Sequence, residues 1–172
     1  MKRLFGLGVA LAAGLSAISV APGTALAAKS SQNHASYTWV VGFTTPSDTA
    51  MAPDGSTITM TGSGSLQAGP GHSAGGGGTF SKSSGGSGTF TVTGMQGFVS
   101  YGSGSAQGLP ADLFGGEAKV KVALSDGTSG VLTIFCVLGS PPMGKMEGIN
   151  VILNRGGNYT KQDGGNTVFI HS

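Results

Sequence analysis

The sequence predicts an all-β protein, a single antiparallel β-barrel or β-sandwich of about 8–10 short strands that follows a cleaved signal peptide. Three observations support this fold class. Apolar and polar residues alternate with a period of two in several short segments, Gly-rich turns separate these segments, and no helical periodicity follows the leader. Parallel strands would need crossovers of about a dozen residues or more, and few such segments exist. The pattern does not distinguish a sandwich from a closed barrel.

The expected strands are recognised by alternation or by short apolar runs. Residues 119–124 place two lysines on the solvent face of a strand and apolar side chains on its core face. The Asp-Gly pair at 126–127 then predicts a hairpin turn. The turn leads into 131–138, which is largely apolar and is therefore expected to be central and covered on both faces. The other expected strands are 37–43, 57–61, 89–93, 97–101, 149–153 and 167–170, with a turn at 94–97 and a connecting loop at 154–165.

Residues 1–27 have the pattern of a secretory signal peptide. A short cationic start precedes the uncharged apolar stretch 4–21, and the Ala-Leu-Ala triplet at 25–27 supplies the small residues that a signal peptidase requires. We therefore expect cleavage before Ala28 and a secreted, extracellular protein without a lipid. The alternative is a membrane anchor, because an apolar run of about 18 residues is just long enough to span a bilayer.

The expected mature chain begins with a flexible lead-in, 28–36, and continues as one β-domain, 37–172. Within it, 62–88 is rich in Gly and Ser, and we expect a largely mobile loop there because ordering glycine costs the most backbone entropy. Residues 62–76 resemble 102–116 in the order of their Gly, Ser, Gln and Pro residues. Either a duplicated strand–loop unit or chance matching in a Gly/Ser-biased chain explains this similarity.

The charge of the mature chain excludes two classes of partner. Two of the nine Lys and Arg lie in the leader, so the mature chain carries seven basic residues against seven Asp and Glu and is formally neutral. Nucleic-acid binding requires a basic face that releases counterions. We therefore expect no nucleic-acid partner and, after signal cleavage, no membrane binding. The sequence indicates no oligomeric state.

The cysteine and histidine residues predict neither a disulfide nor a metal or cofactor site. Cys136 is the only cysteine, and its place in the apolar segment 131–138 indicates a buried residue, against the alternatives of a reactive thiol or an intermolecular bridge. No histidine of the mature chain is spaced with a second potential ligand on a regular element, as a rigid metal site requires. These histidines are His34, His72 and His171. Phosphate-loop and dinucleotide-binding motifs are also missing, so we expect no metal and no cofactor.

One hypothesis is a small secreted enzyme of the barrel type, either an acid-pair hydrolase or an isomerase. Its candidate catalytic residues are Asp112 and Glu117, which flank 113–116, and Glu147, which precedes an expected strand. Two carboxyl groups about 5–9 Å apart could hydrolyse a glycoside. The alternative is that these acids are solvated or paired with nearby lysines. The scarcity and scatter of titratable residues favour this alternative and a protein that is not an enzyme.

The leading hypothesis is a secreted, non-enzymatic β-domain that binds an extracellular protein, a glycan or a small ligand through loops 102–116 and 139–147. Each loop combines apolar residues with stiffening prolines, which is typical of a binding surface or of a lid over the core. We expect Phe114 and Met143 to be exposed. A secreted protein inhibitor with a Pro-rich loop in a protease cleft is a further hypothesis. The candidate binding residues are Gln107, Leu109, Pro110, Leu113, Phe114, Met143 and Met146.

Overall fold

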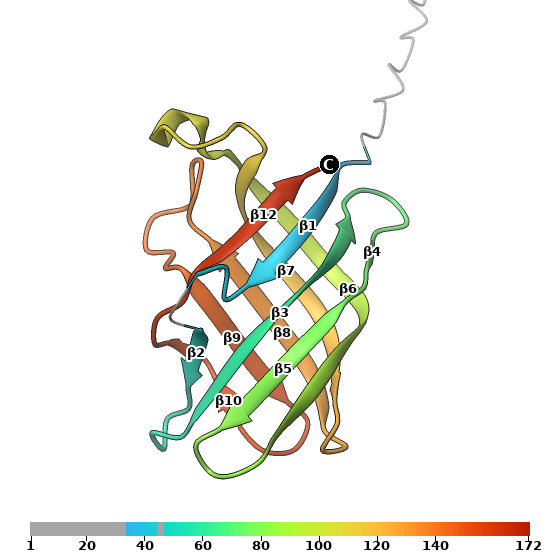
Figure 1. The fold of residues 1–172 in the computed structure, drawn as a ribbon, viewed down its shortest axis with the longest axis vertical. Helices are drawn as coiled ribbons and strands as arrows, with labels where there is room; N and C mark the ends of the chain where they lie inside the picture. Colours follow the sequence, from blue (N-terminus) through green and yellow to red (C-terminus); the bar gives the residue numbers. More distant parts are fainter. Residues whose placement is uncertain (1–33, 45–46) are drawn as a thin grey trace, which may run out of the picture. The chain divides into compact units, whose positions relative to one another are not determined.

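The computed structural model describes residues 34–44 and 47–172, so the expected signal peptide and most of the lead-in lie outside the described residues. Within the described residues, the chain forms twelve strands and one short 3₁₀ helix, and every strand pair is antiparallel (Figure 1). The predicted all-β antiparallel class is confirmed. The elements are β1 (Ser36–Val41), β2 (Asp48–Met51), β3 (Thr57–Gln67), β4 (Ser73–Ala74), β5 (Gly77–Lys82), β6 (Ser87–Ser103), η1 (Gly104–Gln107), β7 (Leu113–Leu124), β8 (Ser129–Cys136), β9 (Gly148–Leu153), β10 (Asn158–Tyr159), β11 (Lys161–Gln162) and β12 (Thr167–His171).

The strands are more unequal in length than the sequence predicted. Three of the twelve described strands, β4, β10 and β11, have only two residues, whereas β3, β6 and β7 have 11, 17 and 12. β6 joins the two strands that we expected at 89–93 and 97–101. The predicted turn between them is wrong, because β6 continues through Gly94 and Gly97 while its register against β7 shifts. Glycines at such β-bulges bend a strand without ending it.

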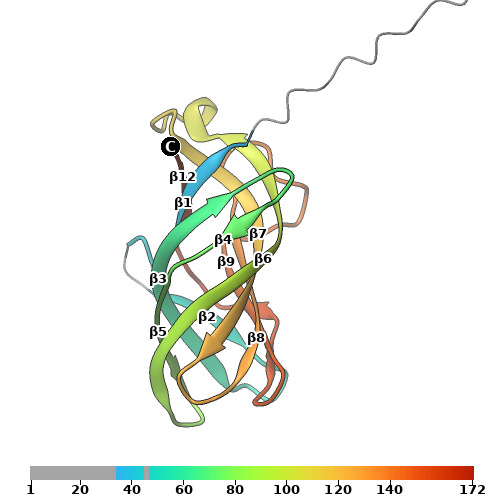
Figure 2. The same cartoon turned by 90° about the vertical axis from the view of Figure 1, so that its right-hand side faces the viewer.

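Six strands form a closed ring of hydrogen-bonded pairs. β7 pairs with β12, β12 with β1, β1 with β3, β3 with β5, β5 with β6, and β6 returns to β7. In Figure 1, β12, β1, β3 and β5 lie in front of β7, β8 and β9. Figure 2 shows β6 between β5 and β7 at the side. Two short runs leave this ring, with β8, β9 and β10 beside β7, and β2 and β11 beside β3.

Two strands of the ring change partners along their length. β7 pairs with β12 through Leu113 and Phe114, and from Gly116 onward it pairs with β8 instead. β3 likewise pairs with β2 over 57–60 and with β1 over 62–67. At each change, two strands that pair with successive stretches of the same neighbour separate from each other. The cavity described below lies where β12 and β8 separate in this way.

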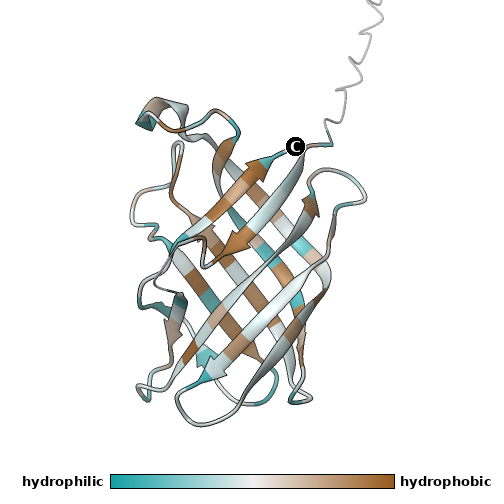
Figure 3. Cartoon of the chain, in the orientation of Figure 1, coloured by the Kyte–Doolittle hydropathy of each residue, from teal (hydrophilic) through white to brown (hydrophobic). Residues whose placement is uncertain are grey.

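The core lies on the inner faces of these strands. Alternate residues of β1 and β7 are buried, as the period-two pattern predicted, and Figure 3 shows the alternation of hydropathy along the strands. Trp39 is fully buried and its ring lies 6.5 Å from that of Phe90. β8 is buried on both faces, as expected. On the face that points away from the core, Phe135 lies under Lys145, whose ammonium is 5.0 Å from the ring centre. Burial of Cys136 is confirmed.

The expected Gly/Ser-rich loop at 62–88 is wrong, because most of this segment belongs to β3, β4, β5 and β6. Gly62 pairs with Gly78, and the backbones approach so closely that a Cβ on Gly78 would collide with the backbone of β3. A Cβ on Gly64 would lie 2.7 Å from the ring of Trp39. Trp39 donates a hydrogen bond of 3.1 Å from Nε1 to the carbonyl of Gly75. Glycine therefore permits close strand packing here, which offsets its entropic cost.

The two segments that resemble each other in sequence differ in local structure. Residues 62–67 are part of β3 and pair with β1, whereas 104–107 form the helix η1. Ser103 caps η1, because its hydroxyl accepts a hydrogen bond from the backbone N–H of Ser105 at 3.2 Å.

Candidate functional site

A cavity of about 390 Å³ lies where β12 and β8 diverge from β7. It combines the ends of these strands with parts of four loops that are far apart in the sequence. Its lining residues are Phe43, Thr44, Leu109, Leu113, Cys136, Leu138, Glu147, Asn166, Thr167 and Val168. Most of this lining is apolar. Glu147 is the one Asp, Glu, Lys or Arg among the described residues that line it.

Glu147 connects the two diverging strands. Its Oε2 accepts a hydrogen bond of 2.8 Å from the backbone N–H of Val137, just after β8, and its Oε1 accepts one of 2.8 Å from the N–H of Thr167 at the start of β12. The hydroxyl of Thr167 lies 2.7 Å from Oε1 and 2.6 Å from the carbonyl oxygen of Phe135. The carboxylate thus accepts hydrogen bonds from two backbone N–H groups, as the carbonyl groups of a neighbouring strand would in a sheet. Glu147 is partly exposed, and within the described residues it pairs with no lysine, so the expected lysine pairing does not apply to it.

Asp48 is a second carboxyl group near the cavity, and its side chain is fully buried. It accepts a hydrogen bond from the backbone N–H of Gly42, whereas its Oδ1 has no hydrogen-bond partner within the described residues. The pKa of Asp48 is raised to about 6, mainly by burial and in part by the charge of Glu147, against the effect of the N–H groups of Gly42 and Asn166.

Sequence analysis did not identify Asp48. The signal that could have found it is the alternation within Asp48–Met51, which places Asp48 on the same face as the fully buried Ala50. A strand of four residues in a Thr- and Pro-rich segment is too short for that alternation to be recognised.

The three candidate catalytic acids do not meet in this cavity. Glu117 lies on β7, and its carboxylate pairs with Lys145 at 2.6 Å and with Lys119 at 3.1 Å. Burial raises the pKa of Glu117, but hydrogen bonds from these two lysines outweigh it and hold the pKa below its ordinary value. Asp112 is exposed, and its backbone carbonyl accepts a hydrogen bond from the backbone N–H of His171 at 2.8 Å. Lysine pairing is thus confirmed for Glu117.

The two predicted binding loops contact each other through Gln107. Its Nε2 donates to the carbonyl of Gly139, and its Oε1 accepts from the N–H of Gly139, both at 3.1 Å. These two reciprocal hydrogen bonds resemble those between the backbones of paired strands, and they hold the two loops together. Leu109 and Leu113 line the cavity. The other candidates do not line it, and Pro110, Met143 and Met146 are exposed.

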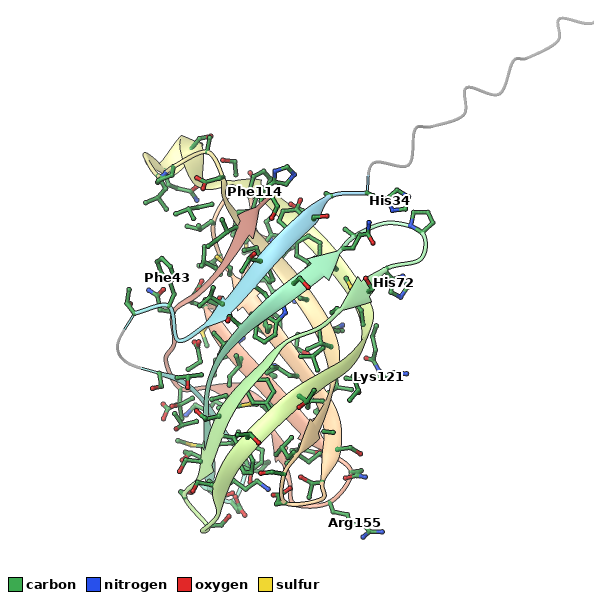
Figure 4. All side chains as sticks on the ribbon, turned by 45° about the vertical axis from the view of Figure 1, so that its right-hand side comes forward. His34, Phe43, His72, Phe114, Lys121 and Arg155 are labelled. Atoms are coloured by element: carbon green, nitrogen blue, oxygen red, sulfur yellow. The ribbon has the colours of Figure 1, made fainter. Side chains whose placement is uncertain are left out.

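Phe114 is half-buried, which corrects the prediction that it is an exposed anchor. The register of β7 against β12 places Phe114 opposite the fully buried Phe169, and its ring packs against the core. The ring lies 5.3 Å from that of His171 and 5.6 Å from that of Tyr37. Figure 4 shows Phe114 beside the end of β12 and Phe43 on the loop that follows β1.

The Phe114→Ala substitution should therefore reduce the free energy of unfolding by about 2–4 kcal/mol, because it removes aromatic packing from the end of the core. Met143→Ala is the matched control, since Met143 is fully exposed in the other loop and its loss should change stability by less than about 0.5 kcal/mol. Urea denaturation of both variants measures the difference. Equal small effects would contradict the core position of Phe114.

The described residues hold no group of three His, Cys, Asp or Glu side chains placed to bind a metal ion. In the part of the chain that the structure covers, no helix has the length and apolar character needed to cross a membrane. No protein-family model matches the chain, and no curated protein or solved structure matches it either.

Proposed function

We propose that this protein is a secreted, non-enzymatic binding domain that holds a small, largely apolar ligand in the cavity between β8 and β12. The observation that carries the proposal is the cavity itself. Its volume of about 390 Å³ lies within the range of about 300–1,000 Å³ that is typical of ligand pockets. Apolar walls with a few polar groups at defined positions are also typical of such pockets.

The walls of the cavity support an apolar ligand. Leu109 and Leu113 come from the first predicted binding loop, and Leu138 immediately precedes the second. Cys136 adds a neutral wall, because burial raises the pKa of its thiol to about 12. The pairing of Gln107 with Gly139 keeps these walls together, so little ordering would be needed on binding.

The remaining parts of the proposal concern the architecture and the location. We propose that the closed ring of β7, β12, β1, β3, β5 and β6 is a β-barrel and not a sandwich, which the continuous pairing around the ring supports. The leader pattern of residues 1–27 supports secretion.

The enzyme hypothesis has less support from the same residues. A general acid or base must reach the substrate directly or through one water molecule. Glu117 is held by two lysines outside the cavity lining, Asp112 is also outside it, and Asp48 is fully buried. Only Glu147 faces the cavity, and three hydrogen-bond donors surround it. We therefore favour binding over catalysis.

The test fills the cavity with a larger side chain. Leu113→Trp should weaken binding of the neutral fluorescent probe N-phenyl-1-naphthylamine at least about tenfold, because the indole would occupy the space of the ligand. Ile152→Trp is the control, since Ile152 is half-exposed on β9 and does not line the cavity. Fluorescence titration of the wild type and of both variants measures the affinity. The proposal is overturned if the wild type shows no saturable binding, or if both variants bind the probe as the wild type does.

A further inference from the structure

Among the described residues, the lining of the cavity contains one carboxylate side chain, that of Glu147. Glu147 is the charged residue of its described lining, and no ion pair of Glu147 exists within the described residues. Lys145, two residues away in the sequence, pairs with Glu117 instead. The Glu147 carboxylate also affects the pKa values of two neighbours, Asp48 and Cys136. Burial is the main reason that both pKa values are raised, and the charge of Glu147 contributes to the rise.

The Glu147 carboxylate has not used all of its capacity to accept hydrogen bonds. An ionised carboxylate offers about four acceptor sites. Oε1 accepts from the N–H of Thr167 and competes with the carbonyl oxygen of Phe135 for the single hydroxyl proton of Thr167, whereas Oε2 accepts only from the N–H of Val137. Oε2 therefore retains a site for a further donor, and none of the three present donors is cationic.

We propose that the ligand of this cavity is an amphiphile with an apolar body and a cationic, hydrogen-bond-donating head, such as a protonated alkylamine, whose head binds Glu147. This inference rests on the proposed function and adds the chemical class of the ligand. The apolar body contacts the leucine side chains of the cavity wall, and the ammonium group donates to Oε2 of Glu147.

The charge of the head decides between ligands with the same apolar body. An ammonium head neutralises Glu147 through a charge-assisted hydrogen bond, which is about twice as strong as a neutral one. An alcohol head donates a hydrogen bond but leaves the charge of Glu147 uncompensated. A carboxylate head adds a second negative charge beside Glu147, which repels it.

The experiment compares three eight-carbon probes with different heads: n-octylamine, n-octanol and n-octanoate. Each competes with N-phenyl-1-naphthylamine on the wild-type protein at pH 7.5. We expect octylamine to bind at least about tenfold more tightly than octanol, with octanoate the weakest of the three. In a second measurement, octylamine should shift the ¹³C resonance of the Glu147 side-chain carboxyl group.

Substitution of the two carboxylates provides the matched comparison. Glu147→Gln should remove the preference for octylamine over octanol, whereas Glu117→Gln, which changes a carboxylate outside the cavity, should retain it. Circular dichroism checks whether Glu147→Gln is folded, because its amide would face the N–H of Val137. If this variant does not fold, the probe ranking and the ¹³C shift on the wild type decide.

Each outcome supports or overturns the inference. Octanol or octanoate binding as tightly as octylamine, or the absence of competition by octylamine while the fluorescent probe binds, overturns the cationic head and leaves the apolar cavity site. A preference for octylamine that survives in a folded Glu147→Gln variant also overturns it, because the amine then binds elsewhere. Failure of the fluorescent probe itself to bind overturns the proposed function together with the inference.

Discussion

Gly64→Ala should reduce the free energy of unfolding by about 3 kcal/mol or more, because the backbone of β3 has no space for a Cβ at this position. That atom would collide with the carbonyl oxygen of Gly75 and would lie 2.7 Å from both the Cα of Gly76 and the ring of Trp39. Two of these three contacts are with backbone atoms, which cannot rotate away. The third is with an indole that is fully buried and hydrogen-bonded.

Gly75→Ala is the matched control for this prediction. Gly75 lies in the same Gly-rich segment, its φ is outside the left-handed region, and a Cβ there would have no atom within 4 Å. Its substitution should change stability by less than about 1 kcal/mol, and the lower entropy of the unfolded chain favours a small gain. Urea denaturation of the mature chain measures both variants. Similar losses for the two would mean that glycine is not required for the approach of these strands.

The strands that sequence analysis identified are those with a local signal. The hairpin at 126–127 forms because Gly127 has a φ of +85° and Asp126 accepts a hydrogen bond from the N–H of Thr128 at 2.9 Å. β8 was recognisable because its apolar run requires burial on both faces. In both cases, residues that are adjacent in the sequence determine the local structure.

The Gly/Ser-rich part of the sheet could not be predicted in this way. Glycine and serine carry no hydrophobic alternation, so β5 and the second half of β3 have no periodic signal. What makes glycine necessary at Gly64 is the close approach of the backbone at Gly75 and Gly76 and of the indole of Trp39, 25 residues earlier in the chain. Such a contact exists only in the folded sheet, and composition alone favours a loop.

Sequence analysis identified several residues of the candidate site but not their convergence in one cavity. Leu109, Leu113 and Glu147 were all among the candidate residues, and all three line the cavity. Their convergence with Phe43 and Thr167 depends on the change of partner along β7, which has no signature in the sequence. For the same reason, the hydrogen bonds that Glu147 accepts from the N–H groups of Val137 and Thr167 were not foreseen.

Asp48→Asn should remove most of a decline in stability that we expect in the wild type as the pH rises from about 4 to about 7. The pKa of Asp48 is raised from 3.8 to about 6 by burial, so between these values the folded state binds a proton that the unfolded state has lost. The contribution of this group is therefore fully present below about pH 4 and is lost as the pH rises through 6. A difference of about two pKa units corresponds to about 3 kcal/mol.

The informative quantity is the change in the mutational effect between pH 4 and pH 7.5, because any fixed cost of burying an amide in place of the Asp48 carboxyl group cancels from it. Relative to the wild type, Asp48→Asn should gain about 3 kcal/mol between these two values. Asp54→Asn is the control, since Asp54 is exposed and hydrogen bonds from Ser56 lower its pKa, so its titration cannot cause a loss of stability as the pH rises. Urea denaturation at both values measures the effect. A wild type and an Asp48→Asn variant with the same pH dependence would show that Asp48 titrates near its ordinary pKa and that its burial does not hold the proton.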